Sequence, residues 1–212
     1  MNKKGILIVI SGFSGAGKGT LMKKLTADFE NYALSISMTT RSPREGEVNG
    51  REYFFVTKEE FEEKIAANGM IEYAGYCGNY YGTPRAYVEE QLENGKDVIL
   101  EIEIQGAHKV KELYPQALLL FVMPPSAQEL YRRLKGRGTE SDEVIQKRMT
   151  RAVEESEGID TYDYIVVNDK LEDCIAQINT IVEAAHNTPA HNEEFIDNIR
   201  KELKDLLKGE ER

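Results

Sequence analysis

The sequence has few cysteines, no tryptophan, no long hydrophobic run and no excess of positive charge. Its two cysteines, Cys77 and Cys174, are far apart in a chain of 212 residues, which argues against a disulfide framework and a thiolate zinc site. A reducing cytoplasm is the simplest compartment for such a chain. The 27 basic and 37 acidic residues give a net charge of −10, which argues against general affinity for nucleic acid or for an anionic membrane.

The apolar run near the N-terminus is short. Residues 6–10 are five consecutive aliphatic residues after two lysines, and the run stops at Ser11 and Gly12. Five residues are too few for the apolar region of a secretory leader or for a membrane span. We therefore interpret this segment as a buried strand, and we expect no membrane partner.

Short β-branched runs alternate with amphipathic stretches along most of the chain, which is typical of a parallel sheet with helices on both faces. Capping boxes at Ser126 and Glu129 and at Asp169 and Glu172 predict two of the helices. The pattern favours an α/β fold, and the length favours one domain with inserts. The predicted buried strands are residues 5–11, 97–104, 117–123 and 163–167.

Residues 34–95 interrupt this alternation, because they are polar and rich in tyrosine and glycine. We interpret them as an inserted subdomain. Thr57 predicts the start of one helix within it, and Thr83 with Pro84 predicts a second helix that ends near Gly95.

Two later segments also depart from the core pattern. Residues 131–151 carry seven basic and three acidic side chains, although the whole chain is acidic. Residues 188–212 follow a proline break and predict an amphipathic helix that docks on its own domain or on a second subunit, so that the chain is a monomer or a homodimer. The apolar residues at helical spacing in this segment are Phe195, Ile196, Ile199, Leu203, Leu206 and Leu207.

The stretch from Gly12 to Thr20 lies between a predicted strand and a helical pattern, which is the context of a phosphate-binding P-loop. Its glycines allow backbone N–H groups to point inward, and Lys18 can reach the outer phosphates of a nucleoside triphosphate. Because Gly19 follows the lysine and the hydroxyl comes one place later, we predict no direct metal ligand in the loop. The predicted ATP contacts here are Gly12, Ser14, Gly15, Ala16, Gly17, Lys18, Gly19 and Thr20.

Together with the P-loop, residues 35–55, 78–83 and 104–106 resemble the guanylate kinase family. The resemblance covers about residues 5–185 and implies a P-loop NTPase core with a GMP-binding insert and a short lid over ATP. The predicted parts are a core of residues 1–33, 96–130 and 152–187, an insert of residues 34–95, a lid of residues 131–151 and a helical extension of residues 188–212.

The resemblance implies that the insert binds GMP. Arg41 and Arg44 would bind its phosphate as forks, and the hydroxyls of Tyr53 and Tyr81 would donate to the remaining oxygens. By spacing alone these residues could equally be solvated arginines and packing tyrosines. Guanine presents two kinds of N–H donor beside an acceptor oxygen, which a carboxylate and a hydroxyl can recognise. The family pattern assigns that recognition to Glu72, Ser37 and Thr83.

Glu101 and Glu103 alternate with apolar residues in the predicted strand 97–104, which places both on one face near its C-terminal end. Ligands bind at this end of parallel sheets. We expect Glu101 to face the metal and phosphates and Glu103 to face the base. The alternative is a pair of carboxylates hydrogen-bonded to neighbouring loops. The expected cofactor is Mg²⁺ with ATP, held mainly by phosphates and water.

The basic segment resembles the family's lid. Arg133 and Arg137 are four apart, and Arg148 and Arg151 are three apart, so each pair can share a helix face. An exposed pair of charged helices is the alternative. The resemblance implies that Arg133, Arg137 and Asn168 bind ATP. It also implies that Arg148 binds GMP and, with Arg137, surrounds the transferring group.

These features predict ATP-dependent phosphorylation of GMP, and of dGMP, in purine nucleotide metabolism. Two alternatives stay open: a phosphopeptide-binding module related to the family, and a P-loop kinase of another small phosphate acceptor. The complete glycine-rich loop and the lid arginines favour the enzyme. Its partners would be small nucleotides, and its predicted catalytic residues are Lys18, Arg41, Arg137 and Arg148.

Overall fold

A five-stranded parallel sheet forms the centre of the molecule. The computed structural model describes residues 4–136 and 141–209, and the sheet order is β2-β7-β1-β8-β9. Because β1 lies in the middle, its aliphatic residues are buried on both faces. The strands are β1 Leu7–Gly12, β2 Tyr32–Leu34, β7 Asp97–Glu101, β8 Leu118–Met123 and β9 Tyr164–Val167.

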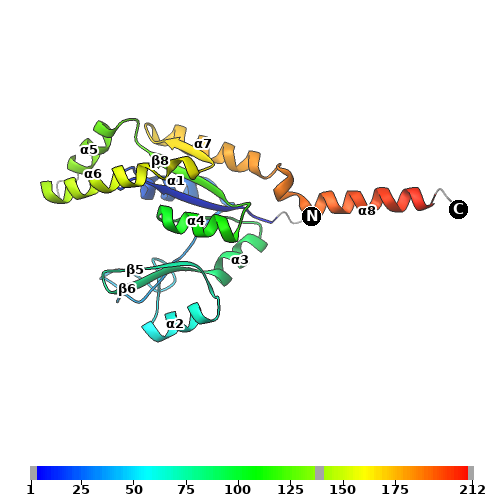
Figure 1. Ribbon diagram of the computed structural model, residues 1–212, viewed down its shortest axis with the longest axis horizontal. Helices are drawn as coiled ribbons and strands as arrows, with labels where there is room; N and C mark the ends of the chain where they lie inside the picture. The colour runs from blue at the N-terminus through cyan, green and yellow to red at the C-terminus, as the bar shows by residue number, and fades with distance from the viewer. Residues whose placement is uncertain (1–3, 137–140, 210–212) are drawn as a thin grey trace.

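Helices cover both faces of this sheet (Figure 1). Ile8 and Ile10 belong to the cluster that includes α1 and α5 to α7, whereas Leu7 and Val9 belong to the cluster that includes α3 and α4. This alternation along β1 confirms the predicted α/β fold. The helices are α1 Lys18–Asp28, α3 Arg85–Glu93, α4 Ile104–Leu113, α5 Ala127–Gly136, α6 Asp142–Ser156 and α7 Leu171–Ala185, with a 3-10 turn η1 at Ile159–Thr161.

A second, four-stranded sheet lies below the core in Figure 1, in the order β4-β3-β6-β5. Helix α2 packs on it through the fully buried Phe61. Thr57 begins this helix as predicted, and it forms a capping box with Glu60. Pro84 is the last residue of β6 and the N-cap of α3, one position before the predicted first turn. The elements are β3 Met38–Thr39, β4 Phe54–Phe55, α2 Lys58–Ala66, β5 Met70–Tyr76 and β6 Asn79–Pro84.

The predicted strand 97–104 is too long. It ends at Glu101, and Glu103 is the N-cap of α4. The ladder stops there because the Ile102 carbonyl accepts a hydrogen bond from the Ser11 hydroxyl at 2.7 Å. The prediction that Glu101 and Glu103 share one strand face is therefore wrong.

Of the two capping boxes predicted in the core, one is half formed and the other is wrong. The Ser126 hydroxyl accepts from the Glu129 backbone N–H at 3.1 Å, but the Glu129 carboxylate binds arginines instead. Helix α7 has Lys170 as its N-cap, without a side-chain cap. Asp169 lies one residue before this N-cap, and its N–H donates to the Val167 carbonyl in a tight turn.

The C-terminal segment forms the predicted helix, α8 Glu193–Gly209, after a 3-10 turn η2 at Pro189–His191. In Figure 1, α8 projects away from the rest of the molecule. Its leucines are more than half exposed, so the predicted docking on its own domain is not what the structure shows. No helix among the described residues has both the length and the apolar character needed to cross a bilayer.

Candidate functional site

The P-loop connects β1 to α1 as the sequence predicts. Gly15 and Gly17 have φ angles of +93° and +92°, which glycine adopts without strain. The Lys18 ammonium donates to the carbonyl oxygens of Gly12 at 2.6 Å and Phe13 at 3.3 Å. These bonds hold the charge at the loop, where an anionic phosphate oxygen would be a stronger partner than a carbonyl.

Asn168 lies behind the loop. Its buried amide donates to the Ala16 carbonyl at 2.7 Å, and a Cβ at Gly17 would lie 2.6 Å from its Nδ2 atom. Ala16 is also buried, whereas Gly19 and Thr20 are exposed in the first turn of α1. Asn168 therefore supports the loop from the side of the core.

Arginines of the predicted lid connect α5 and α6 to the loop. The Arg148 guanidinium donates to the Ser14 hydroxyl at 2.7 Å. Arg133 donates to Glu129 at 2.7 Å and to the Asn168 carbonyl at 2.9 Å. Hydrogen bonds from Arg132 and Arg133 lower the pKa of Glu129 to about 2. The Glu129 carboxylate that binds Arg133 therefore stays ionised. Arg137 lies outside the described residues.

A cavity of about 750 Å³ joins these parts. The P-loop forms one wall, the chain after β7 forms a second, and α6 forms a third. Tyr53, which directly precedes β4, also lines the cavity. Residues from the two predicted nucleotide sites therefore border one space. The lining residues are Ser11, Gly12, Ser14, Lys18, Tyr53, Glu101, Ile102, Glu103, Ile104, Val144, Lys147, Arg148, Arg151 and Glu155.

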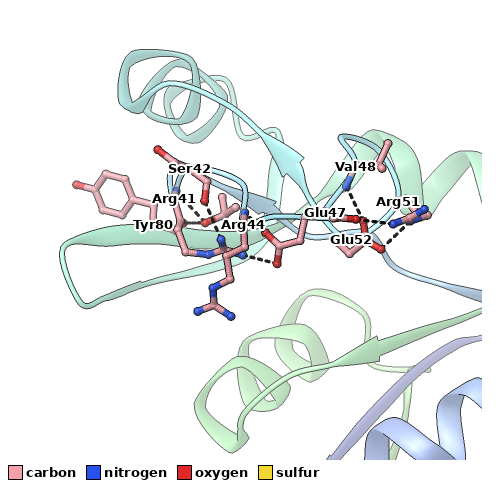
Figure 2. Close-up of polar contacts among 10 residues, drawn as sticks. Arg41, Ser42, Arg44, Glu47, Val48, Arg51, Glu52 and Tyr80 are labelled. Atoms are coloured by element: carbon pink, nitrogen blue, oxygen red, sulfur yellow. Dashed lines mark hydrogen bonds and ion pairs between the residues drawn. The ribbon is translucent and has the colours of Figure 1, made fainter.

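Arg41 is held by a carboxylate that the sequence did not single out (Figure 2). Glu47 accepts from the Arg41 guanidinium at 2.9 Å and from the Arg44 backbone N–H at 2.7 Å. The hydrogen bond from Arg41 lowers the pKa of Glu47. The Arg41 guanidinium also lies over the Tyr53 ring at 5.5 Å, and the rings of Tyr53 and Tyr81 are 6.1 Å apart. The four residues predicted to bind the GMP phosphate, Arg41, Arg44, Tyr53 and Tyr81, therefore lie close to one another.

Figure 2 shows the Arg44 guanidinium pointing away from Glu47, whereas that of Arg41 points toward it. Arg44 is exposed, and Arg41 is half-buried. The two arginines are therefore not equivalent, because only Arg41 has its guanidinium fixed by Glu47.

The carboxylate predicted to recognise guanine lies on the neighbouring strand pair. Glu72 of β5 is opposite Thr83 of β6, and the Thr83 hydroxyl donates to Glu72 at 2.7 Å. Burial raises the pKa of Glu72, and the negative charge of Glu103 adds to this shift. A Cβ at Gly106 would lie 3.3 Å from the second Glu72 oxygen. Ser37 directly precedes β3 in the same sheet.

The two acids after β7 differ in their surroundings. Glu101 is exposed and lines the cavity. Glu103 accepts from the Arg151 guanidinium at 2.6 Å and thereby joins α4 to α6. The structure brings Glu103 close to Glu72 through space, although not through a shared strand face. Among the described residues there is no cluster of three side chains suited to hold a metal ion.

Glu155 is a second residue that the sequence did not single out. One of its carboxylate oxygens accepts from Arg151 at 3.0 Å. The other is buried and has no hydrogen-bond partner within the described part of the chain. Burial raises its pKa, which the positive charges of Arg151 and Lys18 oppose. Its spacing of four residues from Arg151 is the signal that could have found it.

Comparisons with known proteins agree with this geometry. The sequence matches the model of a family described as "Guanylate kinase" over residues 4–185. It is 52% identical to guanylate kinases of Oceanobacillus iheyensis, over 88% of this chain and 90% of that protein, and of Bacillus subtilis, over 88% and 92%. The crystal structure of guanylate kinase from Anaplasma phagocytophilum superposes with a TM-score of 0.69 at 33% identity, covering 90% of each chain.

Proposed function

The chain belongs to the guanylate kinase family and is an ATP:GMP phosphotransferase, and we propose that it works through the residues around the cavity at the P-loop. The observation that carries the proposal is the common border of Lys18, Arg148 and Tyr53 on this cavity. They come from the P-loop, from α6 and from the loop that leads into β4. One space can therefore hold the end of a triphosphate and the phosphate of an acceptor.

The donor end of the site is the P-loop with α6. Its backbone N–H groups and Lys18 would bind the ATP phosphates, and Arg148 would neutralise charge on the transferring group. A phosphate oxygen of GMP then attacks the γ-phosphorus in line, and ADP leaves. Since both substrates are anions, their mutual repulsion has to be cancelled before they can meet, and no side-chain nucleophile is required.

The acceptor end is the second sheet and its loops. Arg41 and Arg44 would bind the GMP phosphate, and the hydroxyls of Tyr53 and Tyr81 would complete its shell. Ionised Glu72 would accept from the guanine N–H groups, with Thr83 and Ser37 beside it. We propose residues 34–95 as the GMP-binding insert and residues 131–151 as the lid. We extend the substrate range to dGMP, since the proposed contacts are to base and phosphate.

Mg²⁺ is the proposed cofactor. The residues present suit it, because Glu101 places an exposed carboxylate on the cavity that Lys18 also lines. Mg²⁺ prefers oxygen ligands, keeps several waters and binds substrate phosphates. Glu101 would hold one of those waters, and the bound ion would supply positive charge to the phosphates. We also propose a reducing cytoplasmic location, since Cys77 and Cys174 are free thiols.

A panel of acceptors tests the function. ADP formation is measured with GMP, dGMP, AMP, UMP and a phosphopeptide at saturating MgATP. We expect GMP to be the best acceptor and dGMP to be phosphorylated, with no turnover of the phosphopeptide. Equal rates with AMP or UMP would contradict the guanine site, and no turnover with any nucleotide would contradict the kinase.

Glu72→Gln should weaken the binding of GMP but not the binding of ATP. The amide keeps the shape but loses the charge and one acceptor, which leaves a guanine N–H without a partner. We expect the KM for GMP to rise about a hundredfold, by analogy with other buried polar contacts, while the KM for ATP stays unchanged. Glu59→Gln, an exposed change on α2, is the matched control. An unaltered KM for GMP would remove Glu72 from the site.

The same variant has a pH signature. Because burial raises the pKa of Glu72, the carboxylate is protonated at a higher pH than an ordinary glutamate. GMP affinity should therefore fall on acidification, and the fall should begin at a higher pH than an ordinary glutamate would give. Glu72→Gln should flatten this dependence, which is followed by isothermal calorimetry of GMP binding.

Glu47→Ala tests the positioning of Arg41. Without Glu47 the guanidinium loses its 2.9 Å ion pair and has to be ordered by GMP itself. We expect the KM for GMP to rise about tenfold, the effect of one charged hydrogen bond, with a smaller change in kcat. Glu45→Ala, an exposed change in the same loop, should leave both constants unchanged. A fall in kcat alone would contradict a positioning role.

A further inference from the structure

Helix α8 carries an apolar face that the kinase site does not use. It lies beyond residues 4–185, which match the family. The leucines Leu203, Leu206 and Leu207 are 57%, 68% and 67% exposed, and Phe195 and Ile199 are 51% and 40% exposed. Such a face is typical of a helix that packs against another helix.

The base of α8 is held firmly to the core. Asn192, directly before the helix, donates to the carbonyls of His186 and Thr188 at 2.8 Å each, and the His186 ring lies 2.9 Å from the buried Asp97 carboxylate. These bonds set the direction in which α8 leaves the molecule (Figure 1). The apolar residues of α8 are left exposed by the described core, so we expect the partner to come from another molecule.

The spacing of the apolar residues is symmetric about Lys201. Phe195 and Leu207 lie six residues from it, Ile196 and Leu206 five, and Ile199 and Leu203 two. In an antiparallel pair of identical helices crossing at this position, each apolar residue therefore faces an apolar residue of the other copy. A two-fold interface needs this self-complementarity, in which residue i meets j and j meets i.

The charges favour the same orientation. Residues 193–199 include three acidic and no basic side chains, whereas residues 200–208 include four basic and two acidic ones. An antiparallel pair places the acidic half of one helix beside the basic half of the other, and it also opposes the two helix dipoles. A parallel pair would place like halves together. This charge layout also suits the dipole of a single helix, but a single helix leaves the apolar face uncovered.

We propose that α8 pairs with α8 of a second copy in an antiparallel two-fold dimer. The two catalytic cores then lie at opposite ends of the helix pair, so neither covers the nucleotide cavity of the other. Dimerisation is therefore independent of the kinase reaction, and it covers the side chains that the monomer exposes.

The test measures the mass of the full chain by sedimentation equilibrium over a range of concentrations. We expect twice the 24.0 kDa of one chain. Leu203→Glu places a charge in the apolar seam and should raise the dimer dissociation constant at least about a hundredfold, with kcat unchanged. Asn198→Glu adds the same charge on the outer face and should leave the dimer intact. A wild-type monomer at every concentration, or a dimer that survives Leu203→Glu, would overturn the proposal.

Cross-linking tests the orientation. In a Cys77→Ser background, the Phe195→Cys and Leu207→Cys chains are mixed and oxidised. The antiparallel arrangement predicts a disulfide between the two different chains and little between identical ones. Preferential linkage of Leu207→Cys to itself indicates a parallel pair and overturns the proposed arrangement.

Discussion

Lys18→Ala is expected to lose at least about a thousandfold in kcat, and up to about 10⁵, with the fold retained. Groups that neutralise the transferring phosphoryl in related reactions contribute that range, which corresponds to about 4–7 kcal/mol of transition-state stabilisation. Lys18 lies at the loop, with its ammonium 2.6 Å from the Gly12 carbonyl.

The loss is measured as ADP formation with GMP in a coupled assay and in a single turnover. Lys23→Ala is the matched control, because Lys23 lies on the same helix and is exposed; its kcat should stay within about twofold. Thermal unfolding of both variants shows whether the loop still folds. If Lys18→Ala kept kcat within tenfold of the natural chain, the P-loop would have no role in the chemistry.

The fold follows from patterns that act locally. Five aliphatic residues before a glycine-rich loop predict β1 and the P-loop, because a central parallel strand is buried on both faces. The predicted helix start at Thr57 is confirmed, since its capping box acts within one helical turn. The end of β7 is different. It depends on Ser11, which is 91 residues away from the carbonyl that it binds, and no local pattern encodes that contact.

Two residues at the site were missed although their contacts are short-range. Glu155 pairs with Arg151 four residues earlier on α6, and Glu47 pairs with Arg41 within one loop. Both lie among other acidic residues in the sequence, which hid these pairings. Glu72 could not be chosen from its neighbours by spacing, since its burial and its bond to Thr83 arise from the pairing of β5 with β6. The residues that we propose as substrate contacts fall in recognisable motifs, whereas the burial and pairing of Glu72 come from strand pairing that no local pattern encodes.

Arg148→Ala is expected to lower kcat by about 10³ to 10⁵, the contribution of an arginine that contacts a transferring phosphoryl group. Arg148 reaches the P-loop from α6, and its guanidinium donates to Ser14 at 2.7 Å on the cavity that Lys18 lines. Arg148→Lys keeps the charge but loses the planar fork, so it should restore only part of the rate. Added guanidinium ion should partly rescue the alanine variant, which a merely structural arginine would not allow.

Two variants separate this chemical role from the bond to Ser14. Ser14→Ala removes the 2.7 Å contact but leaves the guanidinium in place, so its loss should be at least about tenfold smaller than that of Arg148→Ala. Arg132→Ala is the control, since Arg132 is exposed and pairs with Glu129 on the surface. Its kcat should be unchanged within about twofold. A loss below tenfold in Arg148→Ala would remove this arginine from the catalytic residues, and an equal loss in Ser14→Ala would make it a positioning residue of the loop.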